Sequence, residues 1–250
     1  MTTWDYTLLA PTYSLRPPYA ERAVERIVET CGVSRPRVAD IGAGTGHLTL
    51  DLLRHGCSVD AVEPNDAMRS IGQERTSGRA AVRWYRGTAE RSGLPTGAHD
   101  LVTFGSSFNT TDTGPALAEA ARMLTGRGWM ACVWNHRRLD DPLQASIEAL
   151  IRSRVPEYSY GSRRADQSPA IEASGLFSPA TKIEESFHHE MPTADWTAAW
   201  RSHATLQRQA GPLFDSVVAD IEALVRERVG DTVRVPYVTV GWLAPRRRTD

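Results

Sequence analysis

Apolar, β-branched runs alternate with amphipathic stretches along the first 135 residues of the chain. The amphipathic stretches predict helices near Tyr19–Thr30 and at His47–His55, Asp66–Glu74 and Pro115–Leu124. The apolar runs predict five strands, at Arg37–Ile41, Ser58–Val62, Ala81–Arg86, His99–Phe104 and Gly128–Asn135. Strands that alternate with helices build a parallel sheet whose two faces are covered by helices. The pattern therefore predicts an α/β fold.

The alternation changes after residue 136. The stretch Val155–Ser168 reads as a loop, which we interpret as an insertion near a binding cleft. No repeat and no Gly/Ser linker divides the chain, so we predict a single domain over residues 1–250. The elements predicted here are helices at Asp141–Arg152, Ile171–Gly175, Thr193–Ala204 and Pro212–Val229, and strands at Thr181–Met191 and Val233–Leu243.

Composition narrows the classes of partner. The 250 residues include 29 basic and 30 acidic side chains, and this balance leaves no net field to attract nucleic acid. Cys31, Cys57 and Cys132 show no metal-ligand spacing, so we predict no metal site and expect reduced thiols. No basic leader and no run of ~20 apolar residues is present. We therefore expect a cytoplasmic protein that does not associate with membranes.

Three glycines follow the first predicted strand at a spacing of two and two: Gly42, Gly44 and Gly46. Glycine allows positive φ angles and lets a ligand approach the backbone. The dinucleotide fingerprint G-x-G-x-x-G would place its third glycine one residue later. Asp40, at the end of the strand, would repel a pyrophosphate and attract an ammonium group. The loop therefore favours a nucleoside that carries an amino acid over a nicotinamide dinucleotide.

An acidic residue ends the next predicted strand. Glu63 lies about twenty residues past the glycine loop, and a carboxylate there can accept hydrogen bonds from both ribose hydroxyls. Together these features resemble class I S-adenosylmethionine-dependent methyltransferases, whose first motif is similar to VADIGAGTGHLTL at residues 38–50. Residues 58–65, 85–95, 99–109 and 118–128 are also similar to family segments. The resemblance covers residues 11–135 and is weak beyond them.

The resemblance implies a Rossmann-like, mostly parallel sheet of seven strands, with the last strand antiparallel. It also implies S-adenosylmethionine as cofactor and S-adenosylhomocysteine as product. Within the single domain, residues 1–30 would be an N-terminal lid and helix, 31–135 the donor-binding core, and 136–250 acceptor-side insertions and C-terminal strands. The implied donor-binding residues are Tyr13, Arg16, Asp40, Gly42, Ala43, Gly44, Gly46, Glu63, Pro64, Met68, Thr88, Ala89, Glu90 and Ser106.

Two of these assignments carry particular expectations. Thr88 stands where the family usually has an aspartate, which leaves the backbone N–H of Ala89 to bond the adenine, with Thr88 or Glu90 as further partners. Arg16, beside Tyr13, could pair with the donor's carboxylate. The segment 1–19 also carries Trp4, Tyr6 and Tyr19. Because it lacks a long periodic stretch, we expect it to be a mobile lid.

The acceptor side is expected at the carboxyl ends of the fourth and fifth strands. His136 is the candidate base, and an activity that it controls would fall on the acidic side with a pKa near 6 to 7. His188 and His189 are adjacent on a strand and so cannot face one site. Residues expected to contact the acceptor are Ser107, Phe108, Asn109, Trp134, Trp196 and Trp200.

The sequence thus predicts methyl transfer to an oxygen or nitrogen atom of a small, partly apolar metabolite, by a monomer or homodimer. Two alternatives stay open. An NAD(P)-dependent oxidoreductase is disfavoured by the loop spacing and by the absence of a Tyr-x-x-x-Lys pair, since Lys182 is the sole lysine. A non-catalytic subunit that binds S-adenosylmethionine fits the same residues.

Overall fold

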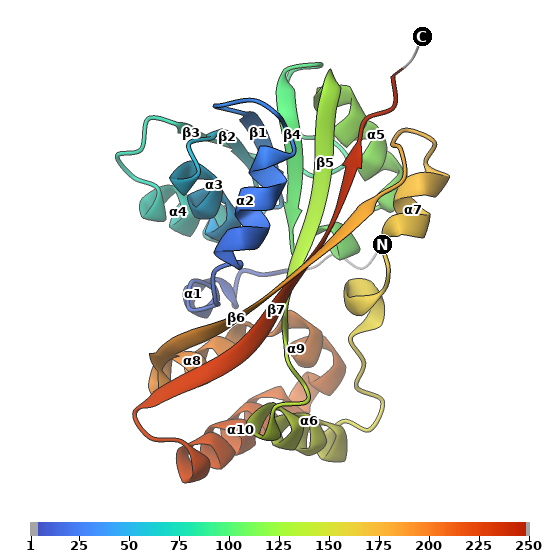
Figure 1. Ribbon diagram of the computed structural model, residues 1–250. Helices are drawn as coiled ribbons and strands as arrows, with labels where there is room; N and C mark the ends of the chain where they lie inside the picture. The colour runs from blue at the N-terminus through green and yellow to red at the C-terminus, as the bar shows by residue number, and fades with distance from the viewer. Residues whose placement is uncertain (1–4, 249–250) are drawn as a thin grey trace.

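The computed structural model describes residues 5–248. A seven-stranded sheet lies at its centre, in the order β3-β2-β1-β4-β5-β7-β6 (Figure 1). Strand β7 is antiparallel to both of its neighbours and the other strands are parallel to one another, as predicted. The strands are β1 (Arg37–Ile41), β2 (Ser58–Val62), β3 (Val82–Tyr85), β4 (His99–Gly105), β5 (Leu124–Arg137), β6 (Thr181–Pro192) and β7 (Thr232–Pro245).

Helices and short 3-10 turns connect the strands. The α-helices are α1 (Ala10–Tyr13), α2 (Glu21–Glu29), α3 (His47–Arg54), α4 (Asp66–Arg75), α5 (Thr113–Met123), α6 (Pro142–Arg154), α7 (Ser168–Ala173), α8 (Thr193–Ala199), α9 (Ala204–Ala210) and α10 (Phe214–Arg228). The 3-10 turns are η1 (Phe108–Thr110), η2 (Gly161–Arg164), η3 (Trp200–Ser202) and η4 (Gly211–Leu213).

Both faces of the sheet are buried, which explains why its parallel strands are continuous apolar runs. Side chains alternate between the faces along each strand. Val38 of β1 packs with α2 and α3, whereas its neighbour Ala39 packs with α5 and α7. The predicted helices on both faces are thereby confirmed. Within residues 5–248, the structure has no helix that is long and apolar enough to span a bilayer.

The last two strands continue past the end of β5. Pairing of β5 with β7 stops at Arg137 and Tyr237, while β6 and β7 stay paired as far as Pro192 and Thr232. This two-stranded extension packs against α6, α8, α9 and α10, whose apolar residues form a cluster of their own. Figure 1 shows that these helices lie beyond one end of the sheet. They therefore face the carboxyl ends of the parallel strands, where ligands bind in open α/β sheets.

Some predicted boundaries were wrong. The helix expected over Thr193–Ala204 ends at Ala199, and α9, which follows it, was not predicted. The Nδ1 atom of His203 accepts a hydrogen bond from the backbone N–H of Leu206 and so caps α9. Helix caps are usually Ser, Thr, Asp or Asn, so an imidazole cap gives no recognisable signal in the sequence.

Candidate active site

The loop between β1 and α3 is pinned to the end of β2. The backbone N–H groups of Gly42 and Ala43 both donate to the Val62 carbonyl, at 2.9 and 3.0 Å. Gly42 and Gly44 have φ angles of +65° and +58°, in the left-handed region that glycine tolerates best. A Cβ atom on Gly44 would have only the tip of Met68 within 3.4 Å, at 3.3 Å. The backbone at Gly44 is therefore open to a ligand.

Gly46 serves the loop in another way. Its φ is +81°, and a Cβ atom there would lie 3.3 Å from the Trp84 ring. It does not line the cavity described below. Gly46 thus allows α3 to start close to β3, and its predicted contact with the donor gains no support from this geometry.

Glu63 lies against the glycine loop. Its two carboxylate oxygens accept hydrogen bonds from the N–H groups of Gly44 and Asn65, each at 2.8 Å. Burial raises the pKa of Glu63, and the two backbone bonds oppose that shift. Each carboxylate oxygen keeps a further lone pair for a ligand hydroxyl. The spacing of about twenty residues in the sequence therefore corresponds to direct contact between loop and acid.

Asp40 is fully buried at the end of β1. It accepts hydrogen bonds from the hydroxyls of Thr49 and Thr103, at 2.6 and 3.0 Å. Burial raises its pKa to about 6, although these two bonds lower it. Asp40 is therefore ionised at neutral pH and becomes protonated in mildly acidic solution.

Asp40 and the backbone of Gly42, Ala43 and Gly44 line one cavity, with about 1050 Å³ of empty space that includes its open mouth. Glu63 lies against the loop, outside the cavity lining. The glycine loop forms one end. The opposite wall comes from the end of β5, from η2 and from the α8–η3 turn. Its lining includes Tyr13, Arg16, Pro17, Tyr19, Asp40, Gly42, Ala43, Gly44, His47, Ser106, Asn135, His136, Arg137, Tyr160, Arg163, Arg164, Trp196, Ala199, Trp200, His203 and Tyr237.

Ser106 is the only non-glycine residue with a positive φ among residues 5–248, at 58°. Its hydroxyl forms a hydrogen bond of 3.0 Å with the Tyr19 hydroxyl, and both residues line the cavity. A non-glycine residue in this conformation is strained, and such strain clusters at ligand-binding sites. The observation supports the prediction that Ser106 faces the ligand.

Three residues expected to contact the acceptor lie outside the cavity lining. Trp134 is fully buried, packs edge-on against Trp242 and donates to the Asn109 side chain at 2.9 Å. Phe108 packs against Phe104 in the same core. The Ser107 hydroxyl donates to the Ile41 carbonyl at 2.6 Å and so joins two loops. All three have structural contacts that explain their positions.

Trp196 and Trp200 do line the cavity, as expected from their spacing on one helical face. Their rings meet edge-on at 6.0 Å. Asn109 lines a smaller hollow nearby, which shares Tyr13, Arg16 and Ser106 with the main cavity. The acceptor half is thus partly aromatic.

His136 lies in the cavity wall and is 7% exposed. Burial, with help from the positive charges of Arg163 and Arg164, lowers the pKa of His136 to about 3. The imidazole is therefore neutral across the physiological range. The sequence predicted that protonation of His136 would lower activity below a pKa of about 6 to 7. The structure does not support this prediction, because the surroundings of His136 oppose a further positive charge.

The comparisons with known proteins agree with this geometry. The model of the family described as "Methyltransferase domain" matches residues 39–132. An uncharacterized methyltransferase of Mycobacterium tuberculosis is 33% identical over 122 residues, which are 49% of this chain and 48% of the relative. The chain thus spans about half the length of the curated relatives that it matches first. Beyond that half, the similarity rests on structure.

A putative type II methyltransferase from Anaeromyxobacter dehalogenans shares the fold, with a TM-score of 0.67 and 20% identity over 92% of this chain and 97% of that one. Residues 39–132 thus match the methyltransferase-domain family, and the whole chain has the Rossmann-like methyltransferase fold. A second structure of this fold is geranyl diphosphate C-methyltransferase from Streptomyces coelicolor with S-adenosyl-L-homocysteine bound. Its TM-score is 0.50, at 18% identity over 90% of this chain and 75% of that chain.

The residues at the glycine-loop end fit S-adenosylmethionine. The Asp40 carboxylate lines the cavity beside the loop and suits the ligand's ammonium group. The open backbone at Gly44 gives room for the nucleoside, and Glu63 keeps acceptor capacity for ribose hydroxyls. When bound, S-adenosylmethionine supplies a methyl group that its sulfonium activates.

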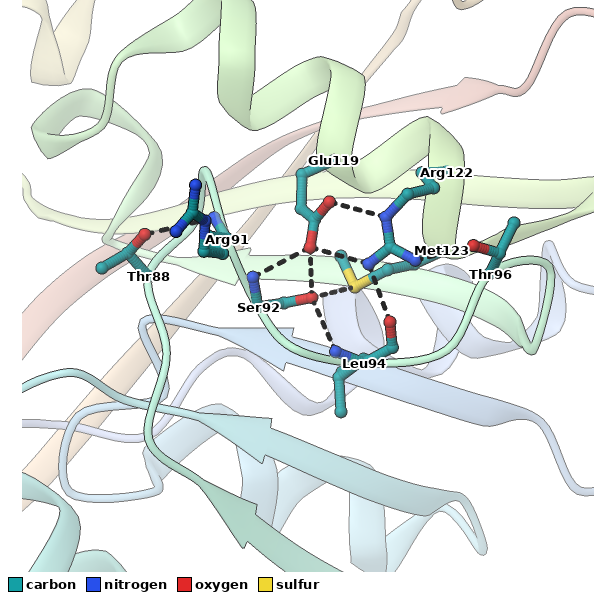
Figure 2. A network of polar contacts seen from close by, with 8 residues as sticks. All are labelled: Thr88, Arg91, Ser92, Leu94, Thr96, Glu119, Arg122 and Met123. Atoms are coloured by element: carbon teal, nitrogen blue, oxygen red, sulfur yellow. Dashed lines mark hydrogen bonds and ion pairs between the residues drawn. The ribbon is translucent and has the colours of Figure 1, made fainter.

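The loop predicted to flank adenine is anchored to α5 (Figure 2). Glu119 accepts hydrogen bonds from the Ser92 N–H at 2.8 Å and from the Ser92 hydroxyl, and its pair with Arg122 holds the pKa of Glu119 at about 2. Arg122 also donates to the Leu94 carbonyl at 2.7 Å. The network fixes the residues that follow Thr88, Ala89 and Glu90. None of these three, nor Glu63, Pro64 or Met68, lines the cavity.

The N-terminal segment covers the donor end of the site. The Asn65 side chain donates to the Thr7 hydroxyl at 3.0 Å, next to Glu63. Arg16 stacks on Tyr13 and donates to the Ser202 hydroxyl at 2.9 Å. The segment therefore bridges the glycine-loop side and η3. Trp4, also assigned to the lid, lies outside the described residues, and pairing of Arg16 with the donor carboxylate stays a prediction.

Sequence reasoning missed Arg137, Arg163 and Arg164, which line the cavity. The chain has 29 basic residues, of which one is lysine, so a single arginine carries little information. Their position in the sequence was the usable signal, because Arg163 and Arg164 lie in Val155–Ser168, the stretch interpreted as an insertion near a binding cleft.

Proposed function

We propose that this methyltransferase transfers a methyl group from S-adenosylmethionine to an oxygen or nitrogen atom of a small metabolite. The observation that supports this most is that the glycine-loop end and a wall containing Trp196, Trp200 and Tyr160 share one cavity. A cavity of this kind accommodates a small, partly apolar acceptor beside the donor. The net charge of −1 argues against a nucleic-acid acceptor.

The residues of the chain would act by binding, orienting and excluding water. Asp40 would hold the ammonium group of the donor and Glu63 its ribose hydroxyls, whereas the aromatic wall would keep water from the reacting atoms. His136, which is neutral, would accept a hydrogen bond from the acceptor's O–H or N–H group. A lone pair on oxygen or nitrogen is already a nucleophile. It would take the methyl group as the C–S bond to the sulfonium breaks, and the acceptor's proton would then pass to solvent through the open mouth, so the transfer needs no strong base.

Turnover tests this function. The protein is incubated with methyl-labelled S-adenosylmethionine and a panel of small hydroxy, carboxy and amino metabolites, and the products are analysed by mass spectrometry. We expect labelled O- or N-methyl products, each formed with one equivalent of S-adenosylhomocysteine. Label on carbon would contradict the proposed atom, and tight donor binding without any product would favour the non-catalytic alternative.

Asp40 gives the site a pH dependence. Because burial raises its pKa to about 6, Asp40 is ionised above that pH and protonated below it. Donor affinity should therefore be highest at neutral pH and fall as the pH drops through about 6, where the attraction to the ammonium group is lost. Titrations with S-adenosylhomocysteine at several pH values across this range should show the fall in affinity, and the Asp40→Asn variant should not show it. If the affinity of Asp40→Asn fell with pH as in the wild type, the pH dependence would belong to another group.

The N-terminal segment should respond to the donor. It contributes Tyr13, Arg16 and Tyr19 to the cavity, and its described helix, α1, has four residues. We expect amide hydrogen exchange over residues 5–19 to slow when S-adenosylhomocysteine is added, because the ligand would hold the segment closed. Helix α10 serves as the internal control and should not change. Equal exchange with and without ligand would show that the segment is not a lid.

A further inference from the structure

The cavity wall opposite the glycine loop contains three guanidinium groups. Arg137 stacks on Trp200 at 4.1 Å, Arg164 stacks on Tyr160 at 4.3 Å, and Arg163 donates to the Asn135 carbonyl at 3.3 Å. Within the described part of the chain, none of the three arginines forms an ion pair with a carboxylate. Arg137 and Arg163 are partly buried, whereas Arg164 is exposed. A partly buried cation without a counterion is unfavourable, so Arg137 and Arg163 favour a wall that is completed by a ligand.

Glu148, the acidic side chain that contacts this wall, already has partners of its own. Glu148 pairs with Arg152 at 2.9 Å and accepts a hydrogen bond from the Tyr160 hydroxyl at 2.6 Å. The cavity's own carboxylate, Asp40, lies at the glycine-loop end. The positive charge of the arginine wall therefore remains uncompensated by the protein.

Unpaired hydrogen-bond donors lie in and behind this wall, since Arg137 and Arg163 line the cavity whereas Gln144 and Tyr158 do not. Among residues 5–248, five buried side-chain atoms have no hydrogen-bond partner, and four of them belong to this region. All four can donate, and they are Arg137 Nη2, Gln144 Nε2, Tyr158 OH and Arg163 Nε. Arg137 links this group to Gln144 by a hydrogen bond of 2.9 Å. Buried donors without partners are rare in folded proteins, so the two that belong to cavity-lining residues, Arg137 Nη2 and Arg163 Nε, indicate a ligand that accepts hydrogen bonds.

We propose that the methyl acceptor carries an oxyanion, a carboxylate or a phosphate, which is bound by Arg137, Arg163 and Arg164. The inference rests on the proposed function in treating this ligand as the methyl acceptor. A planar guanidinium matches a carboxylate or phosphate through two parallel hydrogen bonds. The apolar body of the acceptor would then lie along Trp196 and Trp200, between the oxyanion and the glycine loop.

The same ligand would change the surroundings of His136. The charges of Arg163 and Arg164 help to lower the pKa of this imidazole. An oxyanion on the arginines would offset those charges and make His136 a better hydrogen-bond acceptor. Acceptor binding would thus prepare the residue that is placed to contact the reacting O–H or N–H group.

Three aromatic probes of matched shape test the proposal: benzoate, phenylphosphonate and neutral benzamide. Each is titrated by calorimetry into the protein, with and without S-adenosylhomocysteine. We expect at least one of the two anions to bind at least about tenfold more tightly than benzamide, and its affinity to fall with added salt. Tighter binding of benzoate would identify a carboxylate acceptor, and tighter binding of phenylphosphonate a phosphate acceptor.

Variants locate the anion site. Arg163→Gln should weaken anion binding about tenfold or more and leave the affinity for S-adenosylhomocysteine unchanged. It should fold, because it removes a cation that has no carboxylate partner, and Arg164→Gln at the exposed end of η2 provides a second variant. Arg138→Gln is the matched control, since Arg138 is paired with Asp140 and does not line the cavity.

The proposal would be overturned if benzamide bound as tightly as the anions, if neither anion bound, or if both cavity variants bound the anions as the wild type does. An equal loss of S-adenosylhomocysteine affinity in Arg163→Gln would also overturn it, by assigning the arginine to the donor. Failure of the proposed function has a different signature. Wild-type protein would then bind the anions without S-adenosylhomocysteine and would not bind S-adenosylhomocysteine itself.

Discussion

Gly44→Val is expected to abolish measurable donor binding while the protein remains folded. Gly44 has a φ of +58°, and its missing side chain leaves the cavity open at the loop. A valine there would project into the space of the nucleoside, and its branched side chain resists a positive φ. We expect affinity for S-adenosylhomocysteine to fall by at least about 100-fold, or roughly 2.7 kcal/mol, in a calorimetric titration.

Gly56→Val is the matched control for this variant. Gly56 also has a positive φ, of +79°, and a Cβ atom there would meet nothing within 4 Å, but it lies in the turn between α3 and β2. Its valine variant should show a similar loss of melting temperature and keep donor affinity. Near wild-type affinity in Gly44→Val would mean that the loop does not approach the donor.

Glu63→Ala should weaken donor binding by about 1.5 to 3 kcal/mol, the usual value for hydrogen bonds to a charged group. The carboxylate also accepts from the backbone N–H groups of Gly44 and Asn65, so the alanine variant should loosen the loop as well. Glu63→Gln separates the two effects, because it retains the size of the side chain and one acceptor oxygen. We expect an intermediate loss for glutamine in the same calorimetric titration.

Glu29→Ala, at the exposed end of α2, serves as the control and should bind the donor as the wild type does. The assignment of Glu63 would be contradicted by unchanged affinity in a folded Glu63→Ala variant. Melting curves of each variant show whether the loss of affinity reflects unfolding.

Much of the fold was predictable because the physical signals are local. Strands β1 and β2 have the predicted bounds, since each is a short, mostly apolar run that is buried after its first residue. The sequence assigned Gly44 and Glu63 to one donor site, and the structure brings them into contact because adjacent parallel strands have their carboxyl ends side by side. The antiparallel β7 came from the family resemblance and is confirmed.

The acceptor half was less predictable because it depends on side-chain direction and on distant contacts. Trp134 is close to a strand end, but the register with β7 places it against Trp242 in the core. Arg137 and Arg163 are separated in sequence by helix α6 and a loop, and only the folded chain brings both into one wall. A local sequence pattern cannot predict that two distant residues lie in the same cavity wall. An arginine is especially uninformative in a chain where arginine is common.

A titration of the wild-type protein with S-adenosylhomocysteine, run in parallel with NADH, tests the central claim most directly. The glycine loop, Asp40 and Glu63 predict saturable binding of S-adenosylhomocysteine to a single site per chain and no heat of binding for NADH. Saturable binding of NADH, or no binding of S-adenosylhomocysteine to the folded protein, would contradict the assignment of this cavity to the methyl donor.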